Sequence, residues 1–322
     1  MIVTERNVPS AFYKMGAYMY EHGVSEPSRN GEVVTVPHPV MLEIKKPMER
    51  VLTDPKRDAN PFFHIAETVW MLGGGQGIEF ITWYNKGMNR YSDDGATMNG
   101  AYGHRWRNHF YHDQILGAIQ LLTEDPTTRR AVLAMWDAEI ALASPSLDIP
   151  CNTHIYFRVS GGQLDMTVSN RSNDVVWGML GANSVHMTYL HEVIAAAIGR
   201  PMGAYRVFTV NAHTYVANPQ TVALLHSTEH HDIYQSKGVR PLPVATMPHE
   251  AMKLLSACKT AIAMPWQDSY NSDWLNMVYV PMRNAWRKRK TGKDYSEDLA
   301  QINAPDWRIA CTEWCERRVE DD

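Results

Sequence analysis

A cysteine and an arginine lie at the two ends of a predicted β-hairpin. Cys151 precedes residues 153–159, which alternate as a β-strand does, and residues 163–169 alternate again before Arg171. The intervening Gly161-Gly162 pair is typical of a two-residue hairpin turn. Antiparallel pairing joins the start of the first strand to the end of the second, so we expect Arg171 beside Cys151. A cation beside a thiol lowers its pKa and favours the thiolate, so Cys151 is a candidate nucleophile, although most lone cysteines are inert buried thiols.

A carboxylate is predicted inside an apolar helix. Asn60 and Pro61 form a typical helix start, and the sequence FFHIAETVWML that follows is apolar on nearly every side. Glu67 stands in its middle. A buried carboxylate is costly unless it has partners or a catalytic task, so Glu67 is a candidate general base.

The other predicted elements form one mixed fold. The glycines at 73–75 end the helix and lack the Lys-Ser/Thr of a phosphate loop. Strands and helices are predicted at residues 32–36, 40–44, 111–122, 131–136, 186–199 and 205–210. This succession predicts an α+β fold in a single domain over residues 1–322, with a divergent extension from about residue 220.

Composition narrows the class of protein. The chain has 322 residues, 44% of them hydrophobic, a net charge of -4 and no apolar run long enough to span a bilayer. The four cysteines form neither a CxxC pair nor the close spacing of a disulfide-stabilised protein. Such a cysteine pattern is typical of proteins in a reducing cytoplasm. Cys311 and Cys315 lie one helical turn apart without further ligands, so we expect no metal. The basic tract at 287–290 leaves open a nucleic-acid-binding protein, although such runs are usually solvated helix faces.

Four segments in a fixed order carry a resemblance to a known family. They are PCNTHIYF, NRSNDVVWG, GANSVHMTYL and NAHTY. The chain resembles the thymidylate synthase superfamily, which includes thymidylate synthases and phage-type deoxypyrimidine nucleotide hydroxymethylases, from about Pro61 to Tyr215. The resemblance implies a mixed sheet that is packed against helices and backs a homodimer interface. It also implies a cytoplasmic enzyme, in the host cytoplasm if the source is viral.

The resemblance implies a catalytic role for three residues. Cys151 would add to pyrimidine C6 and make C5 a nucleophile toward the one-carbon unit of methylene-tetrahydrofolate. Glu67 would order water near C4 and C5, and Tyr102 would help to remove the C5 proton through water. Asp174, Trp70 and Gly178 are the positions expected to bind the folate.

The resemblance also implies how a pyrimidine nucleoside monophosphate would bind. The residues expected to bind the phosphate are Arg29, Arg129, Arg130, Arg171 and Ser172. Of these, Arg129 and Arg130 would reach across the dimer interface into the neighbour's site. His213 and Tyr215 would bind the sugar hydroxyl. Counting back from Gly199 places Asn183 at the pyrimidine-reading asparagine, whereas counting forward from Arg171 places Ala182 there.

Two departures bear on the product. Thymidylate synthases usually have histidine after the nucleophile and a short apolar C-terminal tail, whereas Asn152 follows Cys151 here and the chain ends in ERRVEDD. A charged, acidic end cannot close over the site as an apolar tail does, so we expect the site to admit more water. Water is then favoured over hydride as the final reactant, and we expect hydroxymethylation. The alternative is a thymidylate synthase proper. Uracil and cytosine both remain open, because an asparagine amide can pair with either base, although asparagine favours uracil mildly.

Overall fold

The larger of two sheets forms the base of the protein. The structure is a computed structural model that describes residues 1–143, 145–227 and 229–318. Six strands pair in the order β1 (Ile2–Glu5), β4 (Val40–Ile44), β9 (Met202–Thr209), β7 (Gln163–Asn170), β6 (Asn152–Ser160) and β5 (Val132–Ala134). The pairs β1–β4 and β7–β9 are parallel and the others antiparallel, so the sheet is mixed, as expected.

The predicted hairpin is the β6–β7 pair. Gly161 and Gly162 have φ of 58° and 80°, which suits a two-residue turn that glycine adopts at little cost. The register runs from Ser160 opposite Gln163 to Asn152 opposite Asn170, with an irregularity near Asn152. The start of β6 and the end of β7 therefore meet, which places residue 151 beside residue 171.

The two faces of the six-stranded sheet differ in burial. One face is apolar and buried, and it includes Ile155, Leu164, Met166, Val168, Tyr205 and Val207. On the other face the side chains are half-buried or exposed. Among these, Arg206 bridges Glu43 at 2.6 Å and Asp165 at 3.0 Å, while Tyr156 of β6 is 45% exposed. In the single chain this second face is therefore accessible to solvent.

The smaller sheet carries part of the candidate site. Its order is β2 (Val24–Ser28), β3 (Gly31–Thr35), β10 (Ala212–Tyr215) and β8 (Asn173–Asp174). Strands β8 and β10 are parallel and set Asp174 opposite His213. Two segments separated by about forty residues in the sequence thus meet at one edge.

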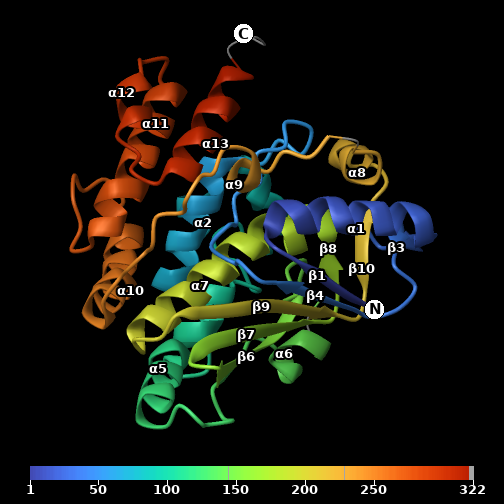
Figure 1. Cartoon of the computed structure of the whole chain (residues 1–322), viewed down its shortest axis with the longest axis horizontal. Coiled ribbons are helices and arrows are strands. Elements are labelled where there is room, and N and C mark those ends of the chain that lie inside the picture. The colour runs from blue at the N-terminus through green and yellow to red at the C-terminus, as the bar shows by residue number, and fades with distance from the viewer. Residues whose placement is uncertain (144, 228, 319–322) are drawn as a thin grey trace.

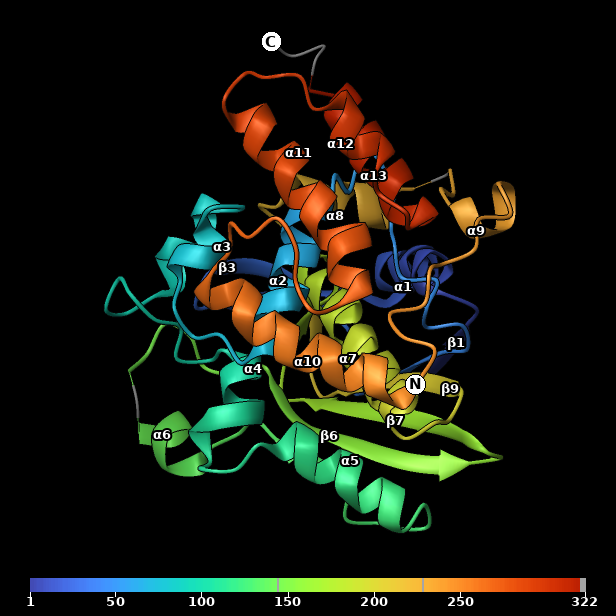
Figure 2. The same cartoon turned by 90° about the vertical axis from the view of Figure 1, so that its left-hand side faces the viewer.

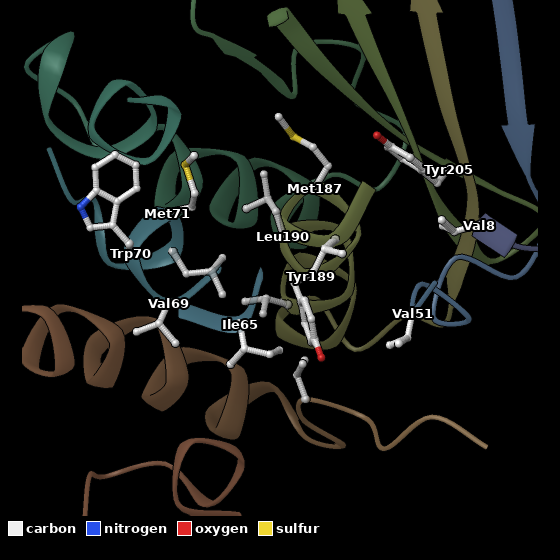
Figure 3. Packing of buried hydrophobic residues seen from close by; sticks show 14 of the residues in the cluster. Val8, Val51, Ile65, Val69, Trp70, Met71, Met187, Tyr189, Leu190 and Tyr205 are labelled. Atoms are coloured by element: carbon white, nitrogen blue, oxygen red, sulfur yellow. The ribbon is translucent and has the colours of Figure 1, made fainter. Parts of the chain in front are cut away.

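Helices cover the buried face of the larger sheet (Figure 1). The central ones are α1 (Val8–His22), α2 (Pro61–Gly73) and α7 (Asn183–Ala197). The side chain of Asn60 caps α2, and Gly74 ends it with φ of 79°, as the sequence predicts. Both α2 and α7 are buried along almost their whole length, and their apolar side chains meet in one core (Figure 3).

The C-terminal region adds an outer layer of helices against α2 (Figure 2). The layer comprises α10 (Pro248–Ala263), η4 (Leu275–Tyr279), α11 (Val280–Lys290), α12 (Ser296–Ala300) and α13 (Pro305–Glu316). The remaining helices are α3 (Glu79–Thr82), η1 (Lys86–Tyr91), α4 (Tyr102–His104), η2 (Arg105–His109), α5 (Gln114–Glu124), α6 (Ala138–Ala143), η3 (Val175–Ala182), α8 (Pro219–Leu225) and α9 (Ile233–Ser236). Within the described ranges, no helix combines the length and apolar character that crossing a membrane requires.

The basic tract is used for contacts within the chain. Lys288 pairs with Asp298 at 2.6 Å, and Lys290 donates to the carbonyl of Trp83 at 2.7 Å. The guanidinium of Arg289 lies 5.2 Å from the ring centroid of Trp314. These cations fasten the end of α11 to its neighbours, which weakens the case for a nucleic-acid-binding surface.

Candidate active site

The hairpin brings Cys151 and Arg171 together. Arg171 Nη2 lies 3.8 Å from Cys151 Sγ. The same guanidinium donates to the carbonyls of Pro150 and Ile149, each at 2.9 Å, and the Arg171 amide donates to the Cys151 carbonyl at 3.0 Å. Arg171 therefore fixes the backbone on both sides of the cysteine and keeps a cation next to its sulfur.

Electrostatics at Cys151 differ from the sequence-based expectation. Burial raises the pKa of the thiol above its ordinary value, while the charges of Arg171 and Arg29 act in the opposite direction. Asp148 and Asp174 add to the upward shift. The prediction that the cation would give a net lowering is wrong for the free protein, because desolvation outweighs it. The charges of the two arginines reduce the upward shift in the thiol pKa that burial causes.

Asp148 is a residue that the sequence reading missed. Its carboxylate accepts the Gly100 amide at 2.7 Å, and its carbonyl accepts from the Asn99 side chain at 3.1 Å. These bonds join the loop before Cys151 to the segment that leads into Tyr102. Burial raises the pKa of Asp148.

Tyr102 lies next to the nucleophile. Its hydroxyl accepts the amide of Asn152 at 3.4 Å, and its pKa is raised by burial. The Tyr102 ring lies 6.0 Å from the ring of His186. His186 in turn approaches Glu67, with 3.5 Å between Nδ1 and Oε2. Glu67 and Tyr102 thus lie on one buried polar path that ends beside Cys151.

Polar side chains gather where β8, β10 and the β2–β3 turn meet. Ser172 Oγ is 3.3 Å from Asn211 Oδ1 and 3.4 Å from His213 Nδ1. His213 Nδ1 also contacts Asn211 Oδ1 at 2.8 Å, and burial lowers the His213 pKa. Tyr215 Oη accepts from Asn30 at 3.5 Å, which ties it to the turn that bears Arg29.

Asn183 lies at the start of α7 and reaches back to β8. Its Nδ2 donates to Asn173 Oδ1 at 3.4 Å. Gly178 packs against both amides, because a Cβ built there would stand 2.4 Å from Asn173 Oδ1 and 3.2 Å from Asn183 Nδ2. The glycine therefore leaves the space that the two amides occupy, and Asn183 rather than Ala182 presents a polar group here.

The Gly178→Ala substitution should disturb this amide pair without unfolding the protein. The added methyl group would displace Asn173, Asn183 or both, so we expect the Km for the ligand that these amides bind to rise about tenfold, equivalent to about 1.4 kcal/mol. Steady-state kinetics with a thermal melt would measure both effects. Gly77→Ala is the matched control, since a Cβ there meets only Ala96 O at 3.9 Å. Equal Km values for the two variants would contradict the packing role.

Asp174, Trp177 and Arg57 form a second cluster at the start of η3. Asp174 Oδ1 accepts the amides of Val176 and Trp177 at 2.8 and 3.1 Å, and burial raises its pKa. Trp177 is 48% exposed, and the Arg57 guanidinium lies 4.7 Å from its ring centroid. Arg57 Nη1 and Nη2 are buried without hydrogen-bond partners in the described part of the chain. An exposed indole over a buried cation suits a planar, anionic ligand.

Trp70 does not join this cluster. It is 2% exposed in the hydrophobic core, and its Nε1 donates to the Gly77 carbonyl at 3.0 Å (Figure 3). The prediction that Trp70 contacts a folate is not supported by its position, because the ring is covered by core residues. Trp177, in the same motif as Asp174, presents the exposed ring instead.

Arg129 and Arg130 are exposed in the connection from α5 to β5. In the ranges that the structure covers, their side chains form no hydrogen bond or ion pair with the rest of the chain. They are therefore not assembled with Cys151 and Arg171 through contacts within the chain. Their position at the edge of the open sheet face leaves them available to a second molecule.

The C-terminal helix is anchored near Arg57. Arg317 pairs with Asp58 at 3.2 Å, and Arg318 Nη1 donates to the same carboxylate at 3.0 Å. The acidic end on which the hydroxymethylation argument partly depends, residues 319–322, lies outside the described residues. Cys311 and Cys315 are buried on α13 and their thiol pKa values are raised by that burial.

Comparison with known proteins gives a consistent result. The family model for thymidylate synthase matches residues 11–234. The deoxyuridylate hydroxymethyltransferase of Pseudomonas phage M6 is 39% identical over 339 aligned positions, which cover 98% of this chain and 94% of that protein. The protein of the same name from Bacillus phage SP01 is 36% identical over 55% of this chain and 49% of its own length.

A solved structure shares the fold. Thymidylate synthase from phage T4 matches with a TM-score of 0.57 and 19% identity, over 68% of this chain and 81% of that one. At this level of identity the likeness concerns the fold alone. It agrees with the mixed sheet and the covering helices described above.

Proposed function

This chain belongs to the thymidylate synthase family, and from that premise we propose that it hydroxymethylates deoxyuridylate at C5, with methylene-tetrahydrofolate as co-substrate. The observation that carries the proposal is the 39% identity, over 98% of the chain, to a protein named deoxyuridylate hydroxymethyltransferase. The substrate choice follows that name, since the asparagine at 183 suits uracil but also accepts cytosine. The pairing of Cys151 with Arg171 supplies the chemistry.

The reaction begins at Cys151. The thiolate adds to C6 of the pyrimidine, which breaks the ring's conjugation and makes C5 nucleophilic. Arg171 favours this step in two ways: its charge opposes the upward shift that burial gives the thiol pKa, and its bonds to the carbonyls of the two preceding residues hold the backbone next to the sulfur. A dianionic phosphate bound at the exposed edge of the same guanidinium would fix the distance from phosphate to ring.

The polar clusters around Cys151 account for the rest of the nucleotide. In this proposal Ser172 and Arg29 contact the phosphate, and His213 with Tyr215 contacts the sugar hydroxyl. Asn183, whose amide also donates to Asn173, pairs with the uracil edge. Together these groups orient C6 toward the sulfur, and orientation of this kind supplies a large part of enzymatic rate enhancement.

The residues around Trp177 fit a folate. When bound, methylene-tetrahydrofolate supplies the one-carbon unit that C5 receives. An exposed indole can stack on a pterin or benzoyl ring, and the unpartnered Arg57 Nη1 and Nη2 are suited to a carboxylate. Asp174 and Gly178 lie in the same segment as Trp177, so these three would contact the folate, whereas Trp70 is buried in the core.

The product distinguishes this function from its rival. Thymidylate synthesis would consume hydride from the folate and form dihydrofolate, whereas hydroxymethylation uses water and leaves tetrahydrofolate. With dUMP, dCMP and CMP as substrates, we expect a hydroxymethyl product from dUMP and no change in absorbance from dihydrofolate. Methylated product with stoichiometric dihydrofolate would refute the proposed function in favour of thymidylate synthase.

We also propose that the enzyme is a homodimer with shared active sites. The open face of the larger sheet supplies an interface, and the free Arg129 and Arg130 at its edge would reach the phosphate bound by the second copy. An Arg130→Ala chain and a Cys151→Ala chain should each be inactive alone. Because a mixed dimer rebuilds one complete site, random mixing should restore about a quarter of the wild-type activity. No recovery between two folded variants would rule out sharing.

A further inference from the structure

A buried histidine of α7 lies beside the proposed general base without a hydrogen-bond partner in the described part of the chain. His186 is 1% exposed and Glu67 is 6% exposed. Although His186 Nδ1 is 3.5 Å from Glu67 Oε2, the geometry is not that of a hydrogen bond. Both ring nitrogens of His186 and Oε2 of Glu67 have no hydrogen-bond partner among the described residues. Buried polar atoms almost always have a hydrogen-bond partner. Three neighbouring buried atoms without one therefore indicate a place where a polar ligand binds.

The neighbouring histidine on the same helix shows the contrast. His191 is also buried and its Nδ1 likewise has no hydrogen-bond partner among the described residues, but its Nε2 contacts the Leu164 carbonyl at 2.6 Å, which gives the ring one structural partner. His186 has no such partner and faces α2 instead of the sheet. Burying an imidazole without hydrogen bonds to its ring nitrogens costs folding free energy. Its presence beside Glu67 therefore points to a function.

The position of His186 links the carboxylate to the reacting ring. His186 is one helical turn after Asn183, the residue proposed to pair with the uracil. On its other side the ring lies 6.0 Å from that of Tyr102, whose hydroxyl accepts the amide of Asn152 beside the nucleophile. A small polar molecule held by His186 and Glu67 would therefore lie between the base-reading and the nucleophilic groups.

We propose that His186 is a positioning residue that, together with Glu67, holds the water that hydroxylates the one-carbon unit. This inference rests on the proposed function and goes beyond it by naming the residue that selects water. It predicts that His186 determines which external nucleophile reaches the exocyclic carbon.

The step is balanced without an oxidant or reductant. Once the C5 proton has been removed and the bond from the one-carbon unit to the tetrahydrofolate nitrogen has broken, with tetrahydrofolate as the leaving group, the one-carbon unit is a methylene group doubly bonded to C5, while sulfur remains on C6. Water oxygen forms a bond to that methylene carbon, the double-bond pair moves onto C5 and C4 as an enolate, and one water proton passes to Glu67. The enolate then expels the Cys151 thiolate, which restores the C5–C6 double bond.

Competition between water and an added thiol tests this role. A small external thiol such as 2-mercaptoethanol also adds to the exocyclic carbon, and it does not need His186. For His186→Gln and His186→Leu, we expect the ratio of hydroxymethyl to thioether product to fall at least about tenfold, toward the loss of about a hundredfold that misplacing a reacting group can cause. Release of tritium from C5 of labelled dUMP, which precedes water addition, should fall much less.

Two controls separate the possible outcomes. His191→Gln removes an equally buried histidine, so it should lower the melting temperature while leaving the product ratio at the wild-type value. Wild-type protein that yields only methylated product would refute the proposed function and this inference with it. If the wild type makes hydroxymethyl product but the His186 variants keep its product ratio, or lose tritium release and product formation equally, the proposed function stands and the role of His186 is refuted.

Discussion

Turnover should fall by at least about 10⁴-fold when Cys151 is replaced by alanine, because the proposed mechanism assigns the bond to pyrimidine C6 to this thiolate. A Cys151→Ser variant should be nearly as inactive, since a hydroxyl is a far weaker nucleophile than a thiolate at neutral pH. Nucleotide binding should persist in both variants, because the proposed phosphate and sugar contacts come from other side chains. Isothermal titration with dUMP and a steady-state assay would separate binding from turnover.

Cys258 provides the matched control. It is buried in α10, and burial raises the pKa of its thiol to about 12, so it should be neither reactive nor catalytic. We expect Cys258→Ala to cost roughly 1 kcal/mol of folding free energy through lost packing, with activity unchanged. Substantial activity in Cys151→Ala would refute covalent catalysis at this residue.

The Arg171→Gln substitution should be the next most damaging. It removes the proposed phosphate ligand, two bonds to the Ile149 and Pro150 carbonyls, and the cation beside the sulfur. We expect a loss in kcat/KM of about 10³-fold, or about 4 kcal/mol, from these combined effects. Arg171→Lys should recover only part of it, because an ammonium cannot supply the same planar fork of donors.

A pH profile distinguishes the electrostatic part of this loss. Burial raises the pKa of Cys151 and Arg171 lowers it, so the substitution should move the pKa further upward. The alkylation rate of Cys151 with iodoacetamide should therefore begin to rise at a higher pH in Arg171→Gln than in the wild type. Arg200→Gln, at an exposed arginine after α7, should leave the profile unchanged. An unshifted profile in Arg171→Gln would show that its charge does not act on the thiol.

Local signals in the sequence determined the parts of the fold that were predicted well. The Gly161-Gly162 pair and its alternating flanks gave the β6–β7 register, and the Asn60 cap with the glycines at 73–75 gave the limits of α2. Both rest on contacts within a few residues. The placement of Arg171 beside Cys151 followed from the hairpin, since pairing alone fixes which strand ends meet.

The helices at both ends of the chain were missed for a different reason. Residues 8–22 form α1, with Asn7 as a capping box and Pro9 in the first turn, and Pro248 begins α10 with Glu250 in its capping box. These signals were present in the sequence. The packing of α10 and α13 on α2 involves residues far apart in the chain, and no local pattern gives it.

The site was predictable only where a motif or a local pairing placed a residue. Whether the Cys151 pKa rises or falls depends on the degree of burial, which a hairpin pattern does not give. Trp70 lies in an apolar helix that could equally have faced a ligand, and the packing of the core decided against it. His186 could have been suspected as a polar residue in a buried helix, but its proximity to Glu67 requires α2 and α7 to be packed together.

Hydroxymethylation of dUMP in water labelled with heavy oxygen tests the central claim most directly. Because water is proposed to add to the one-carbon unit after Cys151 has activated the ring, mass spectrometry should find one labelled oxygen in the hydroxymethyl group of the product. No label should enter when Cys151→Ala replaces the wild type. A methylated product without label, formed together with dihydrofolate, would contradict this account.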